Sequence, residues 1–391
     1  MMGKTKVSAT LKKYTMVIAL ILVMIFFYNK TDGLILLPQN INNLISQNAY
    51  VFVLATGMLL CILTGGNIDL SVGSVVCFVG GIGAMMMDKD VNAVVAVIVM
   101  IVAGILVGVM NGYWIAYVNV PPFIATLAGM YAFRGLSNVV LGGMAITITD
   151  ETFIKVFGGG ADCYVADFLG GPENLNYTCI AAGIVAIVIY IVIQLKNRIN
   201  SKRRGYETAG LFGEIVKMVI ISAVIMWVAW KLAAYKGIPT GLIWVLLVVL
   251  VYGYITTKTR IGRYLYAVGG NEKATRLSGI NTKFVYFFAY TNMGFLAGLT
   301  GILTIARLMS AQPTYGQGYE MDAIGACFIG GASAYGGVGT VAGTIIGAIL
   351  MGVINQGMSI MGIDANWQKV VKGLVLLLAV TFDVLSKKEK K

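Results

Sequence analysis

The sequence predicts an all-α integral membrane protein, a bundle of about ten to twelve transmembrane helices with glycine-broken hairpins. The chain has 391 residues, is 58% hydrophobic, and has 12% charged residues, about half the charged fraction of a soluble protein. Its mean hydropathy is +0.83, and its apolar residues form runs close to the ~20 residues that span a bilayer. Apolar and polar residues do not alternate along these runs, which argues against an outer-membrane barrel.

Twelve hydrophobic runs can be drawn along the chain. They cover residues 14–29, 49–66, 70–87, 92–118, 122–141, 178–195, 215–234, 241–257, 284–306, 322–334, 338–361 and 367–385. The run at 322–334 is short, and the paired runs around Asp69 are also candidates for a re-entrant hairpin, so ten or eleven crossings remain open. No linker divides the chain, and we therefore expect one transmembrane domain, residues 1–391.

The charges predict the orientation in the membrane. A formal charge of +12 is also typical of nucleic-acid-binding proteins, but the basic residues here lie between or beyond the apolar runs, as in cytoplasmic loops. They cluster before residue 14, at 196–204, at 258–283 and at 387–391. We expect no nucleic-acid partner, and we expect both termini in the cytoplasm. The stretch 142–176 is predicted to lie outside, since it holds Asp150, Glu151, Asp162, Asp167 and Glu173 against Lys155 alone.

Histidine is absent from the chain, which removes histidine-based acid–base chemistry, metal ligation and proton relays. We expect no metal and no cofactor. Cys163 and Cys179 lie in or beside the acidic stretch, and a disulfide between them stays open because spacing alone does not show side-chain geometry.

The first candidate functional feature is an interruption at Gly65–Gly66. Asn67, Asp69 and Ser71 follow these glycines inside an apolar stretch. A carboxylate at membrane depth costs several kcal/mol unless a partner compensates it. One interpretation makes Asp69 the cap of a helix that starts at Leu70; the other directs the three polar side chains into a translocation path. A capped break is tolerated chiefly where it is buried in protein or lines a cavity, so the two are compatible.

A second interruption, residues 330–339, is rich in glycine, and two such breaks in one membrane chain are typical of transporters. Asn355 and Gln356 follow it in the next run. Side chains of this kind often hydrogen-bond one helix to another. The alternative is that they offer hydrogen bonds to a neutral polar solute, and we include them in the candidate path.

The third feature is a polar island, residues 258–283. Asn271 is placed to cap a short helix over about 272–278, and Gly279 to end it in a left-handed turn. Ala274 and Leu277 would then share one side of this helix. The simpler alternative is a solvated basic loop.

Three segments of this sequence resemble the permease subunits of ATP-binding-cassette (ABC) sugar importers. The island resembles their coupling loop in Gly269-Gly270-Asn271, in Ala274 and in Leu277-Ser278-Gly279-Ile280. Residues 65–73 and 121–135 resemble two further segments of the family. The similarity covers essentially the whole chain and is closest to the ribose, xylose and galactose branch, with residues 196–240 similar to the xylose-type and multiple-monosaccharide permeases. Thr275 departs from the family, where a second alanine is frequent.

The resemblance implies a homodimer in the bacterial inner membrane that takes up a monosaccharide. Two cytoplasmic ATPase subunits would drive it, and an extracytoplasmic sugar-binding protein would deliver the substrate. The island would fit a groove of the ATPase and transmit its closure. Its candidate coupling residues are Gly269, Gly270, Asn271, Lys273, Ala274, Arg276 and Gly279.

The chain itself agrees with this division of labour. It has no G-x-x-x-x-G-K-[ST] phosphate loop, so ATP hydrolysis would belong to a separate polypeptide. The chain has no histidine and few acidic residues within its apolar runs, so it offers few titratable groups for a proton-coupled mechanism. The alternative is a secondary sugar transporter driven by an ion gradient, with Asp69 as the ion site. A membrane enzyme is disfavoured because no convincing nucleophile–base pair is present.

Overall fold

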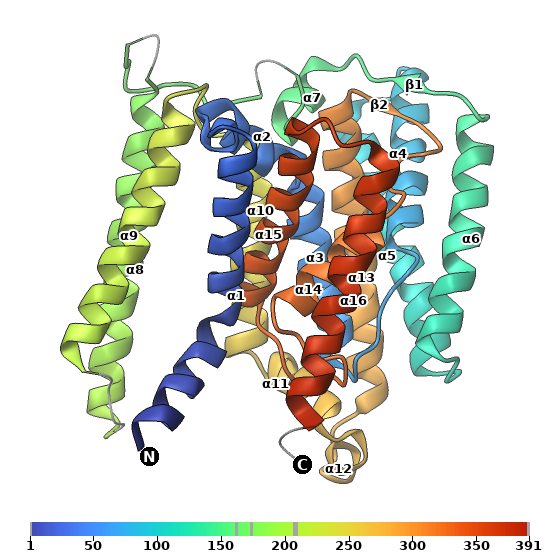
Figure 1. Ribbon diagram of the computed structural model, residues 1–391. Helices are drawn as coiled ribbons and strands as arrows, with labels where there is room; N and C mark the ends of the chain where they lie inside the picture. Colours follow the sequence, from blue (N-terminus) through green and yellow to red (C-terminus); the bar gives the residue numbers. More distant parts are fainter. Residues whose placement is uncertain (1, 161–162, 173–174, 206–209, 389–391) are drawn as a thin grey trace.

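The computed structural model describes residues 2–160, 163–172, 175–205 and 210–388. Asp162, Glu173, Lys390 and Lys391, counted above among the charged residues, lie outside this part. Within it the chain is almost wholly helical (Figure 1). The elements are α1 (Met2–Lys30), η1 (Leu34–Leu36), α2 (Pro38–Gln47), α3 (Ala49–Leu63), α4 (Val72–Asp88), α5 (Ala93–Ala116), α6 (Pro122–Leu141), β1 (Ile146–Thr147), α7 (Glu151–Phe157), α8 (Tyr177–Arg203), α9 (Leu211–Ala233), α10 (Thr240–Lys258), α11 (Arg260–Gly270), α12 (Glu272–Leu277), α13 (Thr282–Leu308), β2 (Ser310–Ala311), α14 (Tyr319–Ile329), α15 (Val341–Ile360) and α16 (Ala365–Lys388). The two short strands pair antiparallel.

The predicted class, a polytopic membrane helical bundle, is confirmed. Among the described residues seven helices are long and apolar enough to cross a membrane, or eight if α2 and α3, bent by 43°, form one span. This count is lower than the ten to twelve crossings expected. The runs at 70–87 and 322–334 form helices of only 17 and 11 residues, and the run at 367–385 contains three charged residues. An 11-residue helix is about 16 Å long, roughly half the bilayer core.

The centre of the bundle is α3. Its residues from Val51 to Leu63 are at most 5% exposed, and α13, α14, α15, α10 and α11 all pack against it. A helix that is apolar on every side is stable only when it is enclosed by other helices. The interruption that follows α3 is partly enclosed, since Asp69 and Ser71 are buried whereas Gly65 is exposed.

Glycines bring α5 and α13 into close contact. A Cβ atom at Gly104 would lie 2.6 Å from the Gly294 carbonyl oxygen, and one at Gly108 would lie 2.7 Å from the Tyr290 carbonyl oxygen. Small residues let membrane helices approach until their backbones touch. Gly294 and Gly298 of α13 make close contacts with α5, and Gly347 of α15 makes one with α14.

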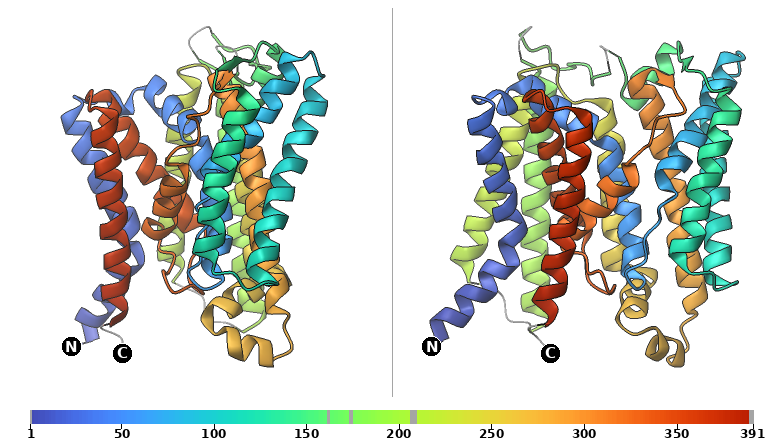
Figure 2. Two further views of the ribbon diagram at one scale, coloured as in Figure 1. Left: turned by 90° about the vertical axis from the view of Figure 1, so that its right-hand side faces the viewer. Right: turned by 45° about the vertical axis from the view of Figure 1, so that its right-hand side comes forward.

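The bundle has two distinct ends (Figures 1 and 2). α11, α12 and the ends of α1 and α16 lie together at one end, whereas α2, α7 and the small sheet lie at the other. The antiparallel pair α8 and α9 stands at the edge of the bundle and touches it mainly through α2. Its side chains are almost entirely exposed in the single chain, which suits lipid or a second protein.

The described parts of the stretch 142–176, residues 142–160, 163–172 and 175–176, lie at the end opposite α12 and pack onto the bundle. Asp150 caps α7 by accepting a hydrogen bond from the Phe153 amide (2.7 Å). The Cys163 thiol donates to the Gly160 carbonyl and the Cys179 thiol to the Ala229 carbonyl, both at 3.3 Å. The two cysteines are held as thiols and do not form a disulfide.

Candidate functional site

The first break joins α3 to α4 through an extended segment, residues 64–71. Asp69 is only 3% exposed, and its Oδ1 accepts hydrogen bonds from the Ser71 amide (2.9 Å) and the Ser71 hydroxyl (2.6 Å). Asn111 of α5 donates in turn to Ser71 Oγ (3.0 Å). The carboxylate thus satisfies backbone and hydroxyl donors at the start of α4, which lipid does not do. The N-cap position of α4 is Ser71 and not Asp69 as expected, and α4 starts at Val72 instead of Leu70. Asp69 thus caps the end of the segment before the helix rather than the helix itself.

The second break is a compact loop between α14 and α15, residues 330–340. Two backbone hydrogen bonds close it, from Ser333 to the Val338 carbonyl (2.9 Å) and from Gly336 to the Ser333 carbonyl (3.0 Å). Thr340 then caps α15 by accepting from the Gly343 amide (3.0 Å). Tyr335 and Val338 are 63% and 55% exposed, so the tip of the loop faces out of the bundle.

The two breaks touch each other through backbone atoms. The Gly337 amide donates to the Leu63 carbonyl at the end of α3 (3.0 Å). A Cβ atom at Gly66 would lie 1.9 Å from the Ala334 carbonyl oxygen, and one at Gly336 would lie 2.4 Å from the Gly65 Cα. No side chain fits between these segments, so glycine is required for their contact.

The polar island joins the same contact. A Cβ atom at Gly269, near the end of α11, would lie 1.9 Å from the Leu63 carbonyl oxygen and 2.3 Å from the Gly337 amide nitrogen. The Tyr266 hydroxyl donates to the Gly339 carbonyl (2.8 Å). We call the five residues Gly65, Gly66, Gly269, Gly336 and Gly337 the glycine junction. It connects the island to both breaks without an intervening side chain.

The short helix predicted in the island is confirmed as α12. The Asn271 side chain accepts from the Ala274 amide (2.9 Å), and Gly279 follows the helix with a φ of +83°. Thr275 donates its hydroxyl to the Ala267 and Asn271 carbonyls (2.9 and 2.8 Å) and so ties α12 to α11. This bond gives a structural reason for the polar residue at a position where the family often has alanine.

The outer side of α12 is exposed. Leu277 is 81% exposed, and Lys273, Ala274 and Arg276 are exposed as well. Leu277 and these neighbours are therefore accessible to a partner protein.

The five residues of the candidate path lie in three places. Asp69 and Ser71 form the buried cap described above. Asn67 lies at the other end of the segment, where it donates to the Thr64 carbonyl (3.3 Å). Gln356 reaches from α15 to Asn40 of α2 (3.5 Å). The amide oxygens of Asn355 and Gln356 are buried and have no hydrogen-bond partner in the described part of the chain.

Sequence reasoning missed α11, the helix that carries Gly269. Its signals were present, since Thr259 caps it by accepting from the Gly262 amide (3.2 Å), and Ile261, Leu265 and Val268 follow at helical spacing. Buried Leu265 and Val268 anchor α11 to the bundle.

It also missed a third non-helical segment, residues 312–318. Arg134 of α6 donates to the carbonyls of Pro313 (3.0 Å) and Tyr315 (2.7 Å). A Cβ atom at Gly73, in the first turn of α4, would lie 2.1 Å from the Gly316 carbonyl oxygen. Arg134 belongs to one of the family-like segments, but nothing in the sequence shows which carbonyls it would bond.

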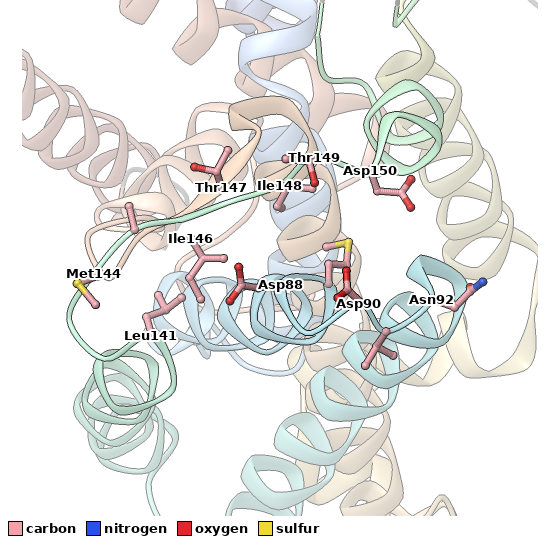
Figure 3. A pocket seen from close by; sticks show the side chains of 13 residues that line it. Asp88, Asp90, Asn92, Leu141, Met144, Ile146, Thr147, Ile148, Thr149 and Asp150 are labelled. Atoms are coloured by element: carbon pink, nitrogen blue, oxygen red, sulfur yellow. The ribbon is translucent and has the colours of Figure 1, made fainter.

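The end of the bundle opposite α12 carries an acidic groove of about 810 Å³. Figure 3 shows Asp88 and Asp90 at the α4–α5 turn and Asp150 before α7 around it. Beyond the groove, Asp167 accepts hydrogen bonds from Thr178, Gly171 and Tyr177. Although desolvation opposes ionisation, these bonds hold the pKa of Asp167 well below its usual value.

Comparison with known proteins identifies the family. A family model described as "Branched-chain amino acid transport system / permease component" matches residues 40–161 and 164–380. The xylose transport system permease protein XylH of Escherichia coli is 35% identical over 97% of this chain and 94% of its own length. XylH of Haemophilus influenzae is 36% identical over 98% of each. The E. coli ribose import permease RbsC is 36% identical over 88% of this chain and 85% of its own.

The chain belongs to the permease family of monosaccharide ABC importers. No solved structure matches it. The permease is a multi-pass protein of the bacterial inner membrane and a transport subunit without an ATPase domain. Membership of this family implies an ATPase and a binding protein as partners.

The Asp69 cap predicts different effects for two substitutions. Asp69→Asn keeps a side-chain oxygen that accepts from the Ser71 amide, so we expect nearly unchanged stability. Asp69→Leu leaves that amide and the Ser71 hydroxyl without an acceptor, which costs about 1–3 kcal/mol per buried group. Thermal unfolding of the purified permease in detergent measures both. Equal unfolding temperatures for Asp69→Leu and the wild type would contradict the cap.

The glycine junction predicts that two adjacent glycines differ in their tolerance. Gly269→Ala drives a methyl group into the Leu63 carbonyl, and we expect destabilisation of about 1–3 kcal/mol or more from overpacking. Gly270→Ala is the matched control, because nothing lies within 4 Å of the added atom. Unfolding temperature and the yield of monodisperse protein report the difference. If both variants behave alike, the close contact at Gly269 does not exist.

Proposed function

We propose that the permease imports a neutral monosaccharide, with the pentose xylose as the first candidate substrate. The two XylH relatives match nearly the full chain, including the region of α8 and α9. In this proposal the permease is a homodimer whose single transmembrane domain places residues 142–176 outside and 258–283 in the cytoplasm. Both termini then face the cytoplasm, since they share the end of the bundle with α12.

The observation that carries the proposal is the direct connection from α12 to both breaks. α12 presents an exposed surface to an ATPase, and α11 behind it contacts the ends of α3 and of the 330–340 loop through Gly269. A displacement of α12 therefore acts on both interrupted segments through packed backbone, which deforms little. In the proposed coupling set Asn271 and Gly279 shape α12, while Lys273, Ala274 and Arg276 face the ATPase. Gly269 and Gly270 join α12 to the bundle.

The polar residues enter the proposed path in two roles. Asp69 and Ser71 keep the start of α4 in place, and Asn67 lies beside the island. Asn355 and Gln356 have amide oxygens that can accept a hydrogen bond from a passing hydroxyl group. A weakly polar path of this kind suits a neutral solute, because tight binding would slow release.

The decisive assay is xylose uptake into proteoliposomes. The permease is reconstituted with its ATPase, ATP is enclosed, and the sugar-loaded binding protein is added outside. We expect accumulation that requires all three proteins and ATP. Uphill uptake by the permease alone under an ion gradient would instead establish the secondary-transporter alternative.

Within this assay Leu277→Asp tests the role of α12. Residue 277 is 81% exposed, so the substitution leaves the fold intact, but it places a charge in the proposed ATPase groove. We expect ATP-driven uptake to fall by about tenfold or more, the effect of losing one well-buried apolar contact. Leu277→Met is the matched control and should retain most of the activity. Full uptake by Leu277→Asp would show that α12 does not carry the coupling.

A further inference from the structure

A small cavity opens at the end of the bundle opposite α12, where the α2–α3 bend meets the ends of α13 and α14. Its volume is about 230 Å³, slightly below the ~300 Å³ at which pockets for drug-sized ligands begin. A single sugar ring is an occupant of suitable size. Its polar and aromatic lining residues are Ser46, Gln47, Tyr50, Thr304, Arg307 and Tyr319.

One wall of the cavity is a pair of stacked tyrosines held in a fixed orientation. The rings of Tyr50 and Tyr319 lie 3.7 Å apart at 17°. The Tyr50 hydroxyl donates to Asp322 (2.6 Å), and Lys372 of α16 pairs with the same carboxylate (3.0 Å). The Asp322 side chain is 2% exposed and that of Lys372 is 23% exposed, and these contacts link α3, α14 and α16 around the wall. An aromatic wall whose geometry is set in advance loses little entropy when a ligand binds.

Two further lining residues, Arg307 and Thr304, carry hydrogen-bonding groups that make no hydrogen bond of ordinary geometry within the described part of the chain. Arg307, in the last turn of α13, is partly buried and forms no ion pair with a carboxylate of the described residues. A guanidinium has five N–H donors in a planar arrangement. The Thr304 hydroxyl, on a residue 5% exposed, lies beside the Tyr319 phenol but makes no hydrogen bond of ordinary geometry. A buried hydroxyl and a partly buried cation without partners are costly for the protein alone.

We propose that this cavity binds one neutral monosaccharide at the outer end of the permease. Arg307 and Thr304 would bond adjacent ring hydroxyls, and the apolar face of the sugar would lie against the tyrosines. Asp322 lies behind Tyr50 and is paired with Lys372, so the choice of a neutral sugar follows from the proposed import function and not from the charge of the cavity. The proposal rests on the import function above. It adds a binding site that the sugar occupies after its release from the binding protein and before its passage through the bundle.

Direct binding to the permease alone in nanodiscs tests this proposal, with xylose as the probe and saturation-transfer NMR as the readout. We expect saturable binding by the wild type. Arg307→Met and, independently, the near-isosteric Thr304→Val should each weaken it by about tenfold, the loss expected for one hydrogen bond from or to a buried group. Arg263→Met, which removes an exposed arginine of α11 at the other end, is the charge-matched control and should bind like the wild type.

The outcomes separate this proposal from the proposed function. Absence of saturable binding by the wild type, or wild-type affinity in both folded cavity variants, overturns the cavity site even if ATP-driven uptake is normal. Tighter binding of glucuronate than of xylose overturns the assignment to a neutral sugar. Loss of uptake in the complete wild-type assay overturns the import function, whatever the cavity binds.

Discussion

The structure depends on a contact between backbones in which side chains take no part. The end of α3, the 330–340 loop and the end of α11 meet at the glycine junction, where the Gly337 amide donates to the Leu63 carbonyl. Added Cβ atoms at Gly66 or Gly269 would lie within 2 Å of a neighbouring carbonyl oxygen. In a membrane such irregular backbone is stable only when protein encloses it. The junction lies at the end of the enclosed helix α3, where Gly336 is buried and Gly66, Gly269 and Gly337 are half-buried.

In the proposed function, this arrangement lets a chain without an ATPase site use ATP hydrolysed elsewhere. The proposed surface for the ATPase is α12, and the segments proposed to open a path are the two breaks. Only α11 separates them, and it contacts both breaks directly. The opposite end of the bundle is built differently, with an acidic groove and a small polar cavity. In the proposed function, the end with α12 thus suits contact with the ATPase, and the opposite end suits entry of the solute.

The sequence predicted the local features well, because they depend on residues close together in the chain. The Asn271 cap, the left-handed turn at Gly279 and the interruptions at Gly65–Gly66 and 330–339 all follow from local rules. The convergence of these features was not predictable, since no local rule brings residue 66 to residue 334. The pairing of Ser71 with Asn111 and of Asp322 with Tyr50 and Lys372 has the same long-range character. The number of crossings stayed open because hydrophobic composition does not distinguish a half-length helix, such as α14, from a full span.

The central claim is that α12 and the second break move as one unit when the ATPase closes. Spin labels at Lys273 of α12, at Val338 of the 330–340 loop and at Val139 near the far end of α6 measure this in the assembled importer by double electron–electron resonance. On trapping with ATP and vanadate, we predict that the 273–338 distance stays constant while both labels shift relative to residue 139. A change in the 273–338 distance with a constant 338–139 distance would contradict the account, because α12 would then move without the break.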